Sequence, residues 1–335
     1  MADRILITGG AGFVGLHLAR RLLRDGADVT LLDDLSRGRA DRDLDQVRAD
    51  ARLVRHDLTT PIPADLLIDD FDEVYHLAAV VGVRQNSENP SLALNVNLRA
   101  VLNLIDWCRR RPPGRVYLSS TSEVADGAAR LGLAPFPVPE DVPFVLPDPS
   151  LPRASYGLSK IVAETLLRQC ADLFPVRIGR YHNIYGPRMG HDHVIPHFVA
   201  RALARKDPFP IYGATQTRAF CHIDDAVDAT IGLTRLPGSE PVVANIGNDT
   251  EEIVIRELAE RVSRLAGYTP TFEVFDPPPG SPDRRLPDLG RLRGTLGYAP
   301  RVNLDRGLRQ TFDWYAATLT ADPTPAVPAL VRDHS

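Results

Sequence analysis

The chain has 335 residues, of which 44% are hydrophobic and 24% are charged, so it can bury a large core in one big domain or in two lobes that share a cleft. Its formal net charge of −4 lacks the basic excess of proteins that neutralise many nucleic-acid phosphates. No apolar run reaches membrane-spanning length, and three scattered cysteines do not make a disulfide framework. We therefore expect a cytoplasmic protein with no nucleic-acid partner and no membrane anchor.

Apolar runs alternate with helical patterns through the first half of the chain. The runs lie at residues 4–8, 29–32, 53–54, 73–77, 115–118 and 176–180. Such alternation predicts an α/β fold, a Rossmann-type doubly wound parallel sheet with helices on both faces.

The alternation weakens after Tyr185, which predicts a second, smaller lobe. We expect a Rossmann domain over 1–185 that includes a return segment at about 210–245, and a C-terminal substrate lobe built from 186–209 and 246–320. The Pro- and Ala-rich tail at 321–335 is expected to fray.

The first predicted turn is rich in glycine. The run TGGAGFVG lies between the first strand and the first helix. Glycine lets a backbone approach a pyrophosphate closely, and the N-terminus of a helix directs N–H groups towards it. The pattern predicts a dinucleotide site with contacts from Gly9, Gly12, Phe13, Val14 and Gly15.

Asp33 ends the second predicted strand, where a carboxylate accepts ribose hydroxyls and repels a 2′-phosphate. This position favours NAD as the cofactor, while Arg37 nearby keeps NADP as an alternative. Further cofactor contacts are expected after the third and fourth strands, at Asp57, Leu58, Ala78 and Ala79, although each of these also suits a loop cap or a packing residue.

Tyr156 and Lys160 are four residues apart, so on a helix they stand on one face. The lysine ammonium can lower the phenol pKa and hold the nicotinamide ribose. The phenolate can then take a hydroxyl proton while hydride leaves for the cofactor. The spacing alone is common, so its meaning depends on the other motifs of the chain.

Several further motifs follow one another between residues 3 and 316. They are HLAA at 76–79, SSTSEV at 119–124, YGLSK at 156–160, RYHNIYGPRMG at 180–190, QTRAF at 216–220 and RRLPD at 284–288. With these motifs the chain resembles an extended short-chain dehydrogenase/reductase of the nucleotide-sugar epimerase, dehydratase and decarboxylase group. The resemblance implies a UDP-sugar substrate, a homodimer, a cofactor contact at Asn97, and binding of the substrate diphosphate by Asn183, Arg218 and Arg285. For Arg218, a contact with the sugar carboxylate is the alternative.

Within this family the run Thr121, Ser122, Glu123 selects the chemistry. Dehydratases carry an aspartate at the second position, for which a serine cannot substitute as an acid, and 4-epimerases usually lack the glutamate. The run therefore most resembles that of the UDP-glucuronate decarboxylases.

The resemblance also implies a role for each catalytic side chain. Tyr156 would deprotonate the 4-hydroxyl, and Thr121 would bond the developing 4-oxygen. The resulting β-keto acid loses carbon dioxide, and Ser122 and Glu123 would position the carboxylate or protonate C5. The product would be UDP-xylose or a UDP-4-keto-pentose.

Two positions depart from the family pattern. Ala125 and Asp126 stand where members usually carry Tyr-Gly. The run RYHN at 180–183, with His182, differs from the Phe-Asn pair common in decarboxylases and resembles the run of sugar epimerases. An NDP-sugar 4-epimerase or 4,6-dehydratase therefore remains an alternative. A non-catalytic dinucleotide sensor would be expected to lose Tyr156, Lys160 or Thr121. His191, His193 and His197 have a spacing that could suit a zinc site. Their segment, however, resembles a family helix that packs over the base of the nucleotide, so we expect no metal site there.

Overall fold

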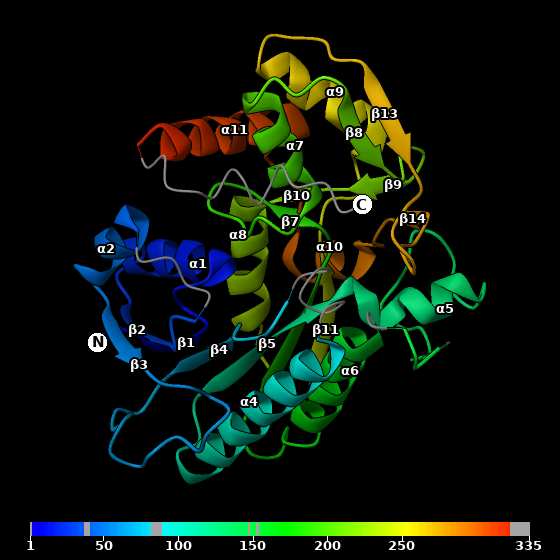
Figure 1. The fold of residues 1–335 in the computed structure, drawn as a ribbon. Coiled ribbons are helices and arrows are strands. Elements are labelled where there is room, and N and C mark those ends of the chain that lie inside the picture. Colours follow the sequence, from blue (N-terminus) through cyan, green and yellow to red (C-terminus); the bar gives the residue numbers. More distant parts are fainter. Residues whose placement is uncertain (1, 37–40, 82–88, 147, 152–153, 322–335) are drawn as a thin grey trace.

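The computed structural model describes residues 2–36, 41–81, 89–146, 148–151 and 154–321. Residues 322–335 of the predicted tail and Arg37 lie outside this part of the chain. The centre is a seven-stranded parallel sheet in the order β11-β6-β5-β4-β1-β2-β3 (Figure 1). Its strands are β1 (Arg4–Thr8), β2 (Asp28–Asp33), β3 (Arg52–Arg55), β4 (Glu73–His76), β5 (Arg115–Thr121), β6 (Val176–Tyr181) and β11 (Val242–Ile246).

Helices cover both faces of this sheet. One face carries α1 (Phe13–Arg24), α2 (Arg42–Arg48), α8 (Ile223–Thr234) and α10 (Gly290–Leu296), and the other carries α4 (Pro90–Arg110) and α6 (Ala154–Arg168). Successive residues of a strand point to opposite faces, so Ile5 and Ile7 pack with the first group of helices and Leu6 with the second. The predicted doubly wound α/β fold is confirmed.

The strand order reverses between β1 and β4. In open parallel sheets, ligands bind outside the carboxyl ends of the strands at such a switch point. The glycine turn follows β1, Asp33 ends β2, Ala78 follows β4 and Thr121 ends β5, so the predicted site residues meet at this edge.

A second core lies above the carboxyl edge of the sheet in the view of Figure 1. It contains apolar residues of α7 (Val194–Leu203), α9 (Ile255–Leu265) and α11 (Leu304–Ala321). Small sheets flank it: β8 (Phe209–Tyr212) pairs with β13 (Phe272–Phe275), β10 (Cys221–His222) pairs with β7 (Ile184–Tyr185), and β9 (Thr217–Ala219) lies between β12 (Glu252–Val254) and β14 (Arg284–Arg285).

The return segment predicted at about 210–245 divides between these two cores. Its first strands, β8 and β9, pair within the small sheets, whereas α8 packs on the main sheet and β11 joins it. Within the described part of the chain, no helix has both the length and the apolar character needed to cross a membrane.

Candidate active site

The glycine turn is packed so closely that side chains do not fit. Gly9 has a φ of +70°, and a Cβ there would lie 2.7 Å from the Ala78 nitrogen. A Cβ at Gly15 would collide with the Gly9 carbonyl oxygen. Helix α1 begins directly after Gly12, and no side chain caps it. The turn and the helix N-terminus therefore have the shape that a pyrophosphate site needs, with Phe13 and Val14 in the first turn of the helix.

Asp33 fastens this turn to the end of β2. Its two carboxylate oxygens accept the N–H groups of Ala11, at 3.0 Å, and of Leu35, at 2.8 Å. Burial raises the pKa of Asp33, and the two N–H groups oppose this shift. The backbone thus holds the carboxylate at the end of β2, and its contact with the cofactor ribose stays a prediction.

Asn97 of α4 uses its amide group within the protein. Its Oδ1 accepts the Val80 N–H at 2.7 Å, and its Nδ2 donates to the Ser159 hydroxyl at 3.1 Å. These bonds join the segment after β4, which contains Ala78 and Ala79, to the helix that carries the catalytic pair. Asn97 therefore helps to hold the segment after β4 against α6. Its direct contact with the cofactor stays a prediction.

Asp57 and Leu58 make the bonds of a turn and of a core. The Asp57 carboxylate accepts the Thr59 N–H at 2.8 Å, while the Leu58 side chain is buried in the core beneath α4. Both contacts match the loop-cap and packing alternatives that the sequence left open.

Tyr156 and Lys160 lie one turn apart on α6, at the carboxyl end of β5. Lys160 is buried, and its Nζ donates to the Ser119 carbonyl oxygen at 2.8 Å. Burial lowers the pKa of Lys160 to about 8, and the Glu164 carboxylate opposes the shift. The ammonium is therefore anchored to the main chain of β5.

The phenol of Tyr156 has a pKa above its ordinary value. Burial is the main cause and the nearby Glu123 carboxylate adds to it, whereas a hydrogen bond with the Thr121 side chain and the charge of Arg285 oppose it. We expected Lys160 to lower this pKa. In the structure the ammonium bonds Ser119 instead, and burial outweighs the lowering influences on the phenol.

The three residues predicted to select the chemistry follow one another from strand to helix. Thr121 is the last residue of β5, and its hydroxyl accepts the Glu123 N–H at 3.3 Å. This bond caps the 3₁₀ helix η1 (Ser122–Ala125), which leads into α5 (Asp126–Arg130). With this cap in place, the Glu123 carboxylate lies near the phenol of Tyr156, and its negative charge raises the pKa of that phenol.

Arg285 stands between two carboxylates. Its Nη2 lies 2.5 Å from an Asp126 oxygen and 3.8 Å from a Glu123 oxygen. The sequence singled out Asp126 only as a departure from the family pattern. The structure makes it the direct partner of a predicted substrate arginine.

Arg218 and Asn183 complete the predicted substrate set. Arg218 is the register partner of Arg285 in the parallel pair of β9 and β14, so the backbones of the two residues lie side by side. It donates to the Thr217 carbonyl oxygen at 2.7 Å. Asn183 has a φ of +46° and donates to the Ala219 carbonyl oxygen at 3.0 Å, beside the same strand.

A buried ion pair behind Lys160 escaped the sequence analysis. Arg180 of β6 makes a fork to Glu164 of α6, at 2.9 and 2.8 Å, and both side chains are almost fully buried. The Ser120 hydroxyl donates to the same carboxylate at 2.5 Å. The position of Glu164, one helical turn after Lys160, is the signal that could have revealed it.

Arg188 also contributes to the cofactor edge without having been predicted. It follows β7 with a φ of +68°, and its guanidinium donates to the Ala11 carbonyl oxygen at 2.9 Å and to Asp41 at 2.8 Å. Asp41 caps α2. A residue near the second core thus holds both the glycine turn and the next helix, and its place in the run RYHNIYGPRMG was the available signal.

In the described ranges, no three His, Cys, Asp or Glu side chains gather closely enough to hold a metal ion. The side chains gathered at the site are a phenol, an ammonium, carboxylates and arginines, close to the glycine turn.

Comparisons with known proteins match these features. The model of the NAD dependent epimerase/dehydratase family matches residues 5–247. The chain is 32% identical to UDP-glucuronic acid decarboxylase 1 of Xenopus tropicalis, over 94% of this chain and 73% of that protein. It is 34% identical to UDP-glucuronic acid decarboxylase 3 of Arabidopsis thaliana, over 91% of this chain and 86% of the relative.

A solved structure shares the same fold. It is a mutant UDP-glucuronic acid 4-epimerase of Bacillus cereus in complex with NAD and UDP-4-deoxy-4-fluoro-glucuronic acid, with a TM-score of 0.82. Its sequence is 28% identical, and the match covers 94% of this chain and 99% of that one.

Proposed function

The chain belongs to the NAD-dependent epimerase/dehydratase family, and from this premise we propose that it decarboxylates UDP-glucuronate. The observation that carries the proposal is the grouping of Thr121, Glu123 and Tyr156. The Thr121 side chain lies near enough to the phenol to lower its pKa, and the Glu123 carboxylate lies near enough to raise it. The decarboxylases of Xenopus and Arabidopsis support the same reading, because the chain resembles them over nearly all its length.

The cofactor fits the described residues. The glycine turn leaves no room for side chains, α1 has no side-chain cap, and the Asp33 carboxylate is held at the end of β2. When bound there, NAD+ accepts the hydride from C4 of the sugar. The Lys160 ammonium is held on the Ser119 carbonyl oxygen one helical turn from Tyr156, and the Tyr156 phenol would take the proton of the 4-hydroxyl.

Oxidation at C4 makes the sugar a β-keto acid. When the bond between C5 and the carboxyl carbon breaks, its electron pair moves to C5 and onto the 4-oxygen, which Thr121 and the protonated Tyr156 stabilise by hydrogen bonds. Glu123 or Ser122 then directs a proton to C5. Return of the hydride gives UDP-xylose, and release before that step gives UDP-4-keto-pentose.

A 4-epimerase of a nucleotide-sugar is the second candidate. It is favoured by His182, which differs from the phenylalanine of decarboxylases, and by the similarity to the epimerase of Bacillus cereus. A 4,6-dehydratase is less well supported, because Ser122 cannot supply the acid that loss of the 6-hydroxyl needs.

Incubating the purified protein with UDP-glucuronate and NAD tests the proposal. Decarboxylation releases carbon dioxide and yields a UDP-pentose, which mass spectrometry detects as the loss of that mass. Conversion to a product of unchanged mass would establish the epimerase instead. UDP-glucose, which has no carboxylate, is the matched control substrate and should give no carbon dioxide.

We further propose that the protein works in the cytoplasm as a homodimer, with its substrate bound between the Rossmann domain and the C-terminal lobe. The family resemblance supports the dimer, and the carboxyl edge of the sheet beneath the second core supports the placement of the substrate. Light scattering of the purified protein would measure the oligomeric state.

A further inference from the structure

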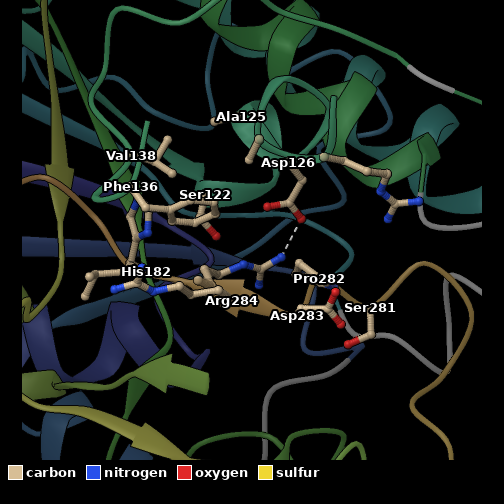
Figure 2. Close-up of a pocket in the computed structure, with 14 residues that line it drawn as sticks. Ser122, Ala125, Asp126, Phe136, Val138, His182, Ser281, Pro282, Asp283 and Arg284 are labelled. Atoms are coloured by element: carbon tan, nitrogen blue, oxygen red, sulfur yellow. Dashed lines mark hydrogen bonds and ion pairs between the residues drawn. The ribbon is translucent and has the colours of Figure 1, made fainter. Parts of the chain in front are cut away.

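A cavity of about 270 Å³ adjoins the residues that select the chemistry. Figure 2 shows Ser122, Asp126 and His182 around it, with Phe136 beside them. Ala125 and Arg285 also line it. Complete small-molecule sites usually measure about 300–1,000 Å³, so this cavity suits one sugar unit and not a whole nucleotide-sugar.

The tautomer of His182 can be deduced from its neighbour on β11. The Asn245 side-chain amide nitrogen donates to the carbonyl oxygens of Val138 and Asp288, at 3.0 and 3.1 Å. The amide oxygen therefore faces His182, whose Nε2 lies 3.1 Å away and must donate to it. The proton of the imidazole is on Nε2.

The other ring nitrogen of His182 is left as an acceptor. Burial lowers the pKa of His182 to about 3, so the ring is neutral and Nδ1 carries a lone pair. The residue is 3% exposed, and among the described residues Nδ1 has no hydrogen-bond partner. A buried acceptor without a donor is costly, so a ligand that supplies a donor here gains affinity.

Two more polar groups of the same wall lack partners. No described residue bonds the Ser122 hydroxyl, and Arg285 Nε is buried without an acceptor in the described chain. Together with His182 Nδ1 they offer one acceptor, one hydroxyl and one donor. A carboxylate or phosphate only accepts hydrogen bonds and cannot satisfy Nδ1, and it would also face the Asp126 carboxylate. A sugar hydroxyl, which both donates and accepts, matches the set.

We propose that His182 is a specificity-determining residue that accepts a hydrogen bond from a hydroxyl of the substrate sugar. This inference rests on the proposed function, because it takes the ligand to be a nucleotide-sugar. Both departures from the family pattern meet at this cavity: Ala125 leaves space where relatives usually have a tyrosine, and His182 adds an acceptor where decarboxylases have a phenylalanine. The protein would therefore recognise the substrate sugar at this wall of the cavity by a hydrogen bond to His182 Nδ1.

The test measures binding to the NAD-loaded protein by calorimetry, with Tyr156→Phe as background to prevent turnover. His182→Phe should weaken UDP-glucuronate binding by about tenfold or more, because a hydrogen bond is replaced by an apolar ring. UDP, which has no sugar, should bind equally to both proteins. His182→Gln, whose carbonyl oxygen can accept, should recover part of the loss.

Equal affinity of UDP-glucuronate for the two proteins would overturn the inference, and so would an equal loss of affinity for UDP. Urea unfolding of each variant confirms that the fold is retained. A failure of the proposed function has a different signature: the protein with Tyr156 intact would bind UDP-glucuronate without releasing carbon dioxide, while the effect of His182→Phe on binding would persist.

Discussion

Arg218 and Arg285 are register partners in the parallel pair of β9 and β14, although they lie far apart in the sequence. Arg218 donates to the Thr217 carbonyl oxygen of its own strand. Arg285 pairs with Asp126, close to the residues of the proposed active site. The family resemblance assigns both residues to the diphosphate, and Arg285 also lines the cavity proposed for the sugar, so the pair adjoins both proposed sites.

This arrangement predicts that Arg218→Gln weakens UDP binding by about tenfold or more, since charge-assisted bonds to phosphate are among the stronger polar contacts. The matched control is Arg284→Gln. Arg284 is the neighbour of Arg285 on β14, but it is half exposed and forms its ion pair with Glu252. Calorimetry with UDP should show a loss only for the first variant, and similar losses for both would argue against the assignment.

Removal of the Tyr156 phenol is expected to cause the clearest loss of activity. Tyr156→Phe should lower the rate of NADH formation from UDP-glucuronate by at least about 100-fold, because general-base catalysis typically contributes 10²–10⁴-fold. NAD binding should persist, since only the proton acceptor is removed. Absorbance at the NADH band in single-turnover mixtures measures the first effect, and NAD titration measures the second. A variant with unchanged turnover would contradict the role of Tyr156.

Arg188 predicts an effect on the cofactor from a residue that need not touch it. Arg188→Met removes the bonds to the Ala11 carbonyl and to Asp41, which should loosen the glycine turn and raise the dissociation constant of NAD about tenfold. Arg188→Lys keeps the charge but cannot reproduce the fork, so it should recover only part of the affinity. Fluorescence titration with NAD distinguishes the three proteins.

The ion pair behind Lys160 predicts a loss of stability and a shifted pH profile. Glu164→Gln leaves Arg180 buried without its counter-charge, which should lower the free energy of unfolding by about 3–5 kcal/mol. Glu164 also raises the pKa of Lys160, so its removal should move the alkaline decline in the rate of NADH formation to lower pH. Replacing both partners with leucine should restore much of the stability, as urea unfolding would show.

Buried neutral histidines predict sensitivity to acid. Burial lowers the pKa of His76 and of His182 to about 3, below the ordinary value of 6.5. As the pH falls below 6.5, the unfolded chain binds protons that the folded protein excludes, so stability present above pH 6.5 is lost on acidification. Urea unfolding at pH 7 and pH 5 measures the loss. In His182→Phe the difference between the two pH values should shrink by about 2 kcal/mol.

The sequence was enough to predict what short-range patterns encode. The period of the apolar residues predicted the sheet and its covering helices, and the glycine turn, Asp33 and the pair Tyr156 and Lys160 occupy the places expected of them. Each of these features depends on residues within one strand, one turn or one helix.

Features that arise from contacts between distant segments could not be predicted in this way. The ion pair of Asp126 with Arg285 joins α5 to β14, and Arg188 reaches the glycine turn from beyond β7. Burial raises the pKa of the Tyr156 phenol. How deeply one side chain is buried depends on the whole fold, so the spacing of residues in the sequence does not predict it. Contacts of this kind depend on how the strands of the small sheets align with one another, and that alignment is set only when the chain folds.

The anchor of Lys160 has a consequence for how this site tolerates mutation. Its partner is the main-chain oxygen of Ser119, and every amino acid at position 119 supplies that oxygen. Random substitution of residue 119 can therefore change the packing around the ammonium but cannot delete its acceptor. To release Lys160 from β5, protein engineers would have to move the strand itself.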